Sequence, residues 1–164
     1  MNPESEALAR RFEQSATEAE AEIAAIPDVR WDALCAAEGW PVAVVACHVA
    51  EGHRFIAGAI RRAAGLCEID PLGGEDIHTI NARHAREHFA VAKDEVLRAS
   101  HENTAYLAGI IRALTPEQLE RTRELAPGRP RLSVRQIVEL AACGHIENHM
   151  QSVRAAVRGQ GVTA

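Results

Sequence analysis

The chain has 164 residues, 47% of them hydrophobic and 25% charged, and its net charge is −5 when histidine is counted as neutral. This length suits one domain, expected to span residues 1–164, which can bury enough surface to fold without a disulfide or a metal. The acidic balance argues against a nucleic-acid partner, and the lack of a signal-peptide core or of an apolar run of roughly 18 residues predicts a cytoplasmic protein without membrane contact.

The first predicted element is a helix that begins after Asn2, carries Pro3 in its first turn and ends before Pro27. Asparagine is a favoured N-cap, and proline is tolerated in the first turn, where its missing N–H group has no helical partner to lose. The apolar side chains step by three and four residues: Leu8, Phe12, Ala16, Ala19, Ile23 and Ile26. This spacing predicts one apolar face that packs against other elements.

A connector with Trp31 and Trp40, both expected to cover the core, leads into a second helix from Pro41 to about Gly65. The expected inward face of this helix consists of seven residues: Val45, Val49, Gly52, Phe55, Ile56, Ala59 and Ile60. The next segment, residues 67–76, contains a proline and two glycines, which predicts a loop.

A third helix is predicted from about Ile77 to Leu114, since no proline interrupts this stretch. Thr115 then begins a short extra helix, and Ser133 with Gln136 forms a capping box that opens a last helix ending near residue 159. No stretch alternates polar and apolar residues as a half-buried strand does. Four amphipathic helices in this order predict an all-α four-helix bundle.

The four cysteines are spread over the chain without a C-x-x-C pair: Cys35, Cys47, Cys67 and Cys143. A zinc knuckle or a redox motif needs closely spaced pairs, and a cytoplasmic compartment keeps isolated thiols reduced. We therefore expect small, buried, free thiols at these four positions.

Two histidines of the last predicted helix, His145 and His149, share a face with apolar residues. They are one turn and about 40° apart, so both rings are expected to point into the bundle. His48 lies on the inward line of the second helix, and Gly52, one turn later, leaves space beside its ring. Three neutral imidazoles with one free coordination position form a divalent-metal site of the catalytic type. Hydrogen-bonded core histidines are the alternative, because spacing alone does not show that His48 reaches the pair.

Two segments resemble a known family. The stretch W-P-V-A-V-V-A-C-H-V-A-E at residues 40–51 is similar to the second-helix motif of the DinB/YfiT-like superfamily, and residues 133–154 resemble its last helix, which carries H-x-x-x-H. The resemblance implies that His48, His145 and His149 bind zinc or nickel in an antiparallel bundle. It also implies a homodimer, and kinship with thiol-dependent S-transferases and with the N-terminal domains of mycothiol-dependent maleylpyruvate isomerases.

Other polar residues lie near the predicted centre. Glu51, one turn after His48 and about 60° around the helix, borders the site and is the candidate catalytic base. Its alternatives are an outer-shell partner of a ligand histidine and a solvated surface carboxylate. Asn81, His84 and Arg86, near the start of the third helix, are candidates for contacts with an anionic substrate.

A second H-x-x-x-H pair, His84 and His88, lies on the third predicted helix. It could belong to a second metal site or a polar pocket, but its charged neighbours favour partial exposure. His53 lies about 140° around the second helix from His48 and is expected outside the inward line. None of these three histidines is predicted to bind the first metal ion.

The sequence thus predicts a metal-dependent enzyme that acts on a small molecule, either a thiol-dependent S-transferase or a hydrolase. Its expected cofactors are a divalent ion, zinc or nickel, and a low-molecular-weight thiol. A divalent ion held by neutral ligands lowers the pKa of water or of a thiol beside it, which serves either reaction. The alternatives are a bundle that binds a metal or a small molecule without turnover, and a bundle whose metal is only structural or absent.

Overall fold

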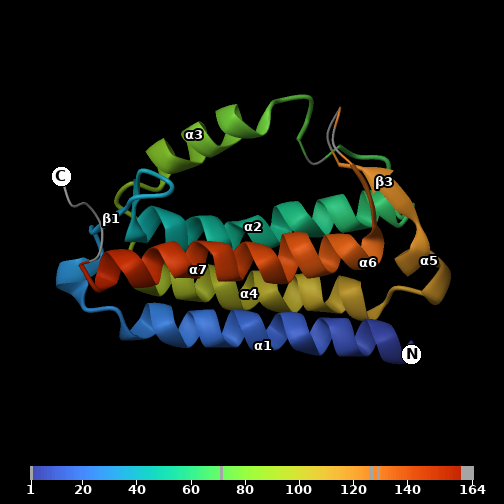
Figure 1. Cartoon of the computed structure of the whole chain (residues 1–164), viewed down its shortest axis with the longest axis horizontal. Helices are drawn as coiled ribbons and strands as arrows, with labels where there is room; N and C mark the ends of the chain where they lie inside the picture. Colours follow the sequence, from blue (N-terminus) through green and yellow to red (C-terminus); the bar gives the residue numbers. More distant parts are fainter. Residues whose placement is uncertain (1, 71, 126–127, 129, 160–164) are drawn as a thin grey trace.

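The computed structural model of the chain describes residues 2–70, 72–125, 128 and 130–159, so Pro71, in the predicted loop, lies outside the described residues. Four long helical segments lie side by side (Figure 1). They are α1 (Pro3–Ala25), α2 (Val42–Ala63), α4 (Lys93–Arg112) and a last segment made of α6 (Val134–Ile137), the π-helical turn η2 (Val138–Cys143) and α7 (Gly144–Val157). The predicted all-α four-helix bundle is confirmed.

The direction of the helices follows from contacts between their ends. Lys93, at the start of α4, donates from Nζ to the carbonyl oxygen of Ile26, just after α1, over 2.6 Å. Ser5, at the start of α1, donates from Oγ to the carbonyl oxygen of Leu114, just after α4, over 2.7 Å. α1 and α4 are therefore antiparallel. α2 runs in the same direction as α4, and α3 (Ile77–Glu87) carries the chain back along α2 between them (Figure 1).

The core is built on the apolar stripes that the sequence predicts. Phe12 and Ile23 of α1 are almost completely buried, and Asn2 caps the helix by accepting from the backbone N–H of Glu4. The first turns of α2, residues 42–47, are buried around the whole helix, because α4, α7 and α3 contact α2 from different sides. All four cysteines are free thiols, as expected, and three of them are buried.

The single helix predicted from Ile77 to Leu114 is wrong, because α3 ends at Glu87 and α4 begins at Lys93. The intervening residues are held by the segment that follows α1. The Trp31 indole N–H donates to the carbonyl oxygen of Val91 over 2.9 Å, and Val91 packs against the core. This contact turns the chain from the outer face of α2 into the bundle. No glycine or proline marks the break, because a tertiary contact causes it.

Two short hairpins are also absent from the sequence prediction, which found no strands. β1 (Leu34–Cys35) pairs with β2 (Trp40–Pro41), and β3 (Thr122–Glu124) pairs with β4 (Arg131–Ser133), both antiparallel. Strands of two or three residues are too short to show an alternating pattern. Between the hairpins in the chain, the predicted short helix appears as α5 (Pro116–Glu120), with a complete capping box. Within the part of the chain that is described, none of the helices combines the length and apolar character needed to span a bilayer.

Candidate metal centre

The structure brings together the three histidines that the sequence singles out, His48 from α2 and His145 and His149 from α7. One ring nitrogen of each lies within 4.8 Å of the others. The ring centroids are between 4.6 and 5.0 Å apart, and the Nε2 atoms of His48 and His145 are 3.2 Å apart. The antiparallel packing of α2 and α7 makes this possible, because it sets both helix faces against the same space.

The protonation of these rings fits a bound cation. Burial, with the neighbouring His149 and His84 rings, lowers the pKa of His48 to about 4. Burial, with the neighbouring His48 and His149 rings, lowers the pKa of His145 to about 3. At neutral pH both rings are therefore uncharged, and each keeps a lone pair. Neutral imidazoles that converge on one point are the ligands that zinc and similar divalent ions take.

His149 is oriented by a carboxylate that sequence reasoning missed. Its Nδ1 atom lies 2.8 Å from Oε1 of Glu38, and Oε2 of Glu38 accepts from the hydroxyl of Ser152 over 2.5 Å. The ionised carboxylate only accepts, so Nδ1 of His149 carries the hydrogen and Nε2 is free to bind a metal. Such carboxylate–histidine pairs orient metal ligands in many proteins. Glu38 lies in the turn between β1 and β2, and no local sequence pattern predicts its contact with α7.

Gly52 leaves space beside the centre, as predicted, but the ring that uses the space is His145. A Cβ atom at position 52 would lie 2.9 Å from Cε1 of His145. The absence of a side chain on α2 therefore lets the imidazole of α7 come close to His48.

We expect Gly52→Ala to weaken metal binding by on the order of 10–100-fold, the scale of a disturbed ligand orientation. The added Cβ is too close to the His145 ring, which can rotate away, so the fold is retained while the ligand is misplaced. Titration against a chromophoric chelator measures the affinity. Gly109→Ala on α4 is the matched control, because nothing lies within 4 Å of its added Cβ. The control should keep the affinity of the wild type, and equal affinities for both variants would contradict the prediction.

A π-helical turn precedes the α7 histidines and was not predicted from the sequence. Residues 138–143 form η2, and their Val138, Ala142 and Cys143 side chains are buried. Turns of this kind are uncommon and occur frequently at functional sites. Leu140, on the same turn, is exposed and lines the space beside the histidines.

A cavity of about 760 Å³ lies beside the three histidines, which all form part of its wall. α2, α3, η2, α7 and the β1–β2 turn surround it. Of the predicted substrate contacts, Asn81 and His84 line the cavity, whereas Arg86 is exposed and does not. Glu51 also lines it. A volume of this size suits a small organic molecule.

Glu51 is not a free carboxylate at the cavity wall. Its two oxygens lie 3.2 Å from Nδ1 of His84 and 3.2 Å from Nε2 of His88. The hydrogen bond from His84 lowers the pKa of Glu51 despite its partial burial. The partial exposure predicted for His84 and His88 is confirmed, and both rings face Glu51.

The prediction that His53 lies outside the inward line of α2 is wrong. The side chain is completely buried, with the ring edge-on to Phe12 at 5.0 Å and Nδ1 at 3.4 Å from the Thr104 hydroxyl. α2 is covered on more than one side, so His53, which turns away from His48, meets Phe12 of α1 and Thr104 of α4 instead of solvent. Burial lowers the pKa of His53 to about 4.

The comparison with protein families agrees with this site. The model of the family described as "Mycothiol maleylpyruvate isomerase N-terminal domain" matches residues 4–144. The match contains His48 and ends one residue before His145. No curated protein and no solved structure gives a significant match. The family model covers most of the chain, which therefore belongs to the mycothiol maleylpyruvate isomerase N-terminal domain family of the DinB/YfiT-like superfamily.

Proposed function

We propose that the chain is a metal-dependent enzyme that adds or transfers a low-molecular-weight thiol to a small organic molecule. The observation that carries this proposal is the convergence of three half-buried imidazoles on the wall of a cavity. Three protein ligands leave a coordination position for a reactant, whereas a purely structural ion takes four. The description of the family to which the chain belongs names mycothiol, a low-molecular-weight thiol. This description favours a thiol as the second reactant.

The residues of the centre hold the ligands in the state that a cation needs. Burial keeps His48 and His145 neutral, and Glu38 keeps the hydrogen of His149 on Nδ1. Trp40 packs edge-on against His48 at 5.5 Å between ring centroids and closes one side of the cavity. A divalent ion bound by these rings would supply a Lewis acid that lowers the pKa of a thiol.

The cavity wall indicates the kind of substrate. Phe55, Ile77 and Leu140 supply apolar surface, and Asn81 and Asn148 supply amide groups that donate and accept hydrogen bonds. An electrophilic molecule with a short carbon skeleton and one or two polar groups fits this lining. We propose that Asn81 orients such a polar group, as expected from the sequence, since it faces the cavity from α3.

The proposal is tested by loading the protein with zinc or nickel and following the consumption of small electrophiles with and without thiols, mycothiol included. Turnover is expected only when the ion and the thiol are both present, and it should be lost in His145→Ala. Turnover without any thiol would instead identify a hydrolase. Saturable binding of electrophiles without turnover would identify a binding protein.

A further inference from the structure

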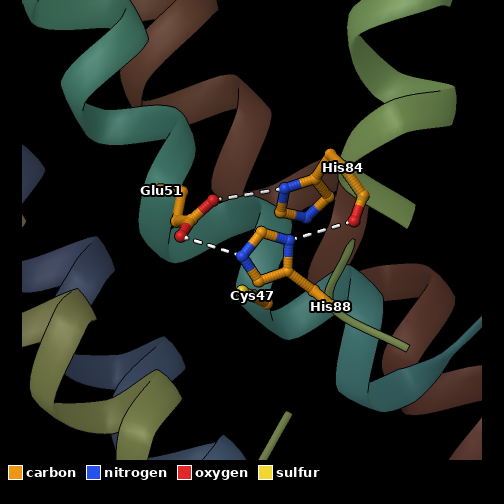
Figure 2. A group of neighbouring side chains, drawn as sticks. All are labelled: Cys47, Glu51, His84 and His88. Carbon is orange, nitrogen blue, oxygen red and sulfur yellow. Dashed lines mark hydrogen bonds and ion pairs between the residues drawn. The ribbon is translucent and has the colours of Figure 1, made fainter. Parts of the chain in front are cut away.

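A second group of metal-ligating side chains adjoins the three-histidine centre (Figure 2). Cys47 and Glu51 are one turn apart on α2, and His88, the residue just after α3, follows His84 of α3 by one turn. One ligand atom from each of the four lies within 4.8 Å of the others. The rings of His84 and His48 are 5.3 Å apart between centroids, so the two groups are neighbours without sharing a residue.

The contacts of His88 determine which of its nitrogens carries a hydrogen. Nδ1 lies 3.0 Å from the carbonyl oxygen of His84. A carbonyl oxygen only accepts, so Nδ1 is the donor, and Nε2 of the neutral ring presents a lone pair. This Nε2 atom lies 3.2 Å from Oε1 of Glu51 (Figure 2). The oxygens of an ionised carboxylate also only accept hydrogen bonds. Two acceptors at this distance require a cation between them, either a proton or a metal ion.

Glu51 also contacts His84, whose Nδ1 atom can donate from a neutral ring. Its other oxygen lies 3.2 Å from Nδ1 of His84, and the rings of His84 and His88 are stacked with centroids 4.4 Å apart. Two protonated rings at this distance repel each other, so a network held by protons places the extra proton on His88 and leaves His84 as a neutral donor. One metal ion attracts the carboxylate and both lone pairs together.

Cys47 favours the metal ion over a proton. The Cys47 residue is 3% exposed, and its thiol lies in the same group. A network that joins Glu51 to two imidazoles through protons gives this thiol no role. Two imidazoles, a carboxylate and a thiolate are ligands that zinc accepts, and four protein ligands make a closed site of the structural type. We propose that Cys47, Glu51, His84 and His88 bind a second divalent ion of the zinc class. Binding releases the thiol proton of Cys47 to solvent.

The second ion holds α3 against α2. All eleven residues of α3 are described, and none of them is fully buried, so apolar packing contributes little to the position of this helix. His84 also lines the cavity beside the three-histidine centre. By holding His84, the second ion therefore fixes one wall of that cavity. In this role Glu51 binds a cation instead of moving a proton. The second site uses none of the three histidines of the first centre, so an experiment that disproves metal binding at one site leaves the proposal for the other site unaffected.

Cobalt(II) tests the proposal, because a thiolate ligand gives a sulfur-to-cobalt charge-transfer band in the near ultraviolet and three imidazoles do not. The full-length, metal-free protein is titrated with cobalt(II) chloride. We expect two ions per chain and a charge-transfer band that saturates with one of them. Binding of the ion should also slow amide hydrogen exchange in residues 77–87.

Matched variants assign the band to these residues. Cys47→Ser is expected to lose the band and one of the two ions, and Cys67→Ser, which changes a thiol outside the group, should keep both. Since Cys47 is buried, His88→Gln serves as a second variant at a partly exposed position and should lose the same ion. His145→Ala should lose the other ion and keep the band. A wild-type protein without the band, or a band that persists in Cys47→Ser, overturns the proposal.

Discussion

Replacing His145 with alanine is expected to remove the ion of the three-histidine centre. Two imidazoles are too few to hold a divalent ion, and the His145 ring lies between Gly52 and His48, in contact with both. The variant should bind one zinc ion fewer per chain in a competition titration. Glu38→Gln provides a graded comparison, because the loss of a partner that only orients His149 costs roughly 10–100-fold in affinity. The effect of His145→Ala should exceed that range.

His101→Ala is the control for this experiment, since His101 is exposed on α4. It should retain the metal content and affinity of the wild type. If His145→Ala retained the full metal content, the three rings would be core histidines, the alternative that spacing left open. A loss in both variants would point to destabilisation of the bundle, which thermal unfolding measures separately.

Acid is expected to destabilise the metal-free protein through His53. The pKa of this ring is about 4 in the folded chain and roughly 6.5 in the unfolded chain, so below pH 6.5 the unfolded chain binds a proton that the folded chain does not. The stability contribution is therefore complete above pH 6.5 and is lost as the pH falls towards 4. At about 1.4 kcal/mol per pH unit, the loss is on the order of 3 kcal/mol.

The His53→Gln variant isolates this contribution, because glutamine does not titrate and can still bond to Thr104. Urea unfolding at several pH values between 7 and 4 gives the free energy of unfolding for both proteins. His48 and His145 also have lowered pKa values, but they are present in both proteins and cancel in the difference. Equal pH dependence in the wild type and the variant would show that folding does not lower the pKa of His53, contrary to this prediction.

The sequence alone determined the helices whose limits are set locally. The Asn2 cap, the capping boxes at Thr115 and Ser133 and the step of three and four residues along α1 all act within one or two turns. Local rules also placed His145 and His149 on one helix face, since helical phase depends only on the spacing along the chain. The resemblance of residues 40–51 and 133–154 to a known family then added His48 to the pair.

Only the tertiary structure decided which helix faces are covered and by what. Helical phase separates His53 from His48, but the burial of His53 depends on its contacts with α1 and α4. The contact of Glu38 with His149 spans 111 positions of the chain, and no local pattern encodes it. The break before α4 likewise follows from the contact between Trp31 and Val91. Periodicity specifies where a side chain points relative to its own helix axis, whereas partners from distant segments exist only once the chain has folded.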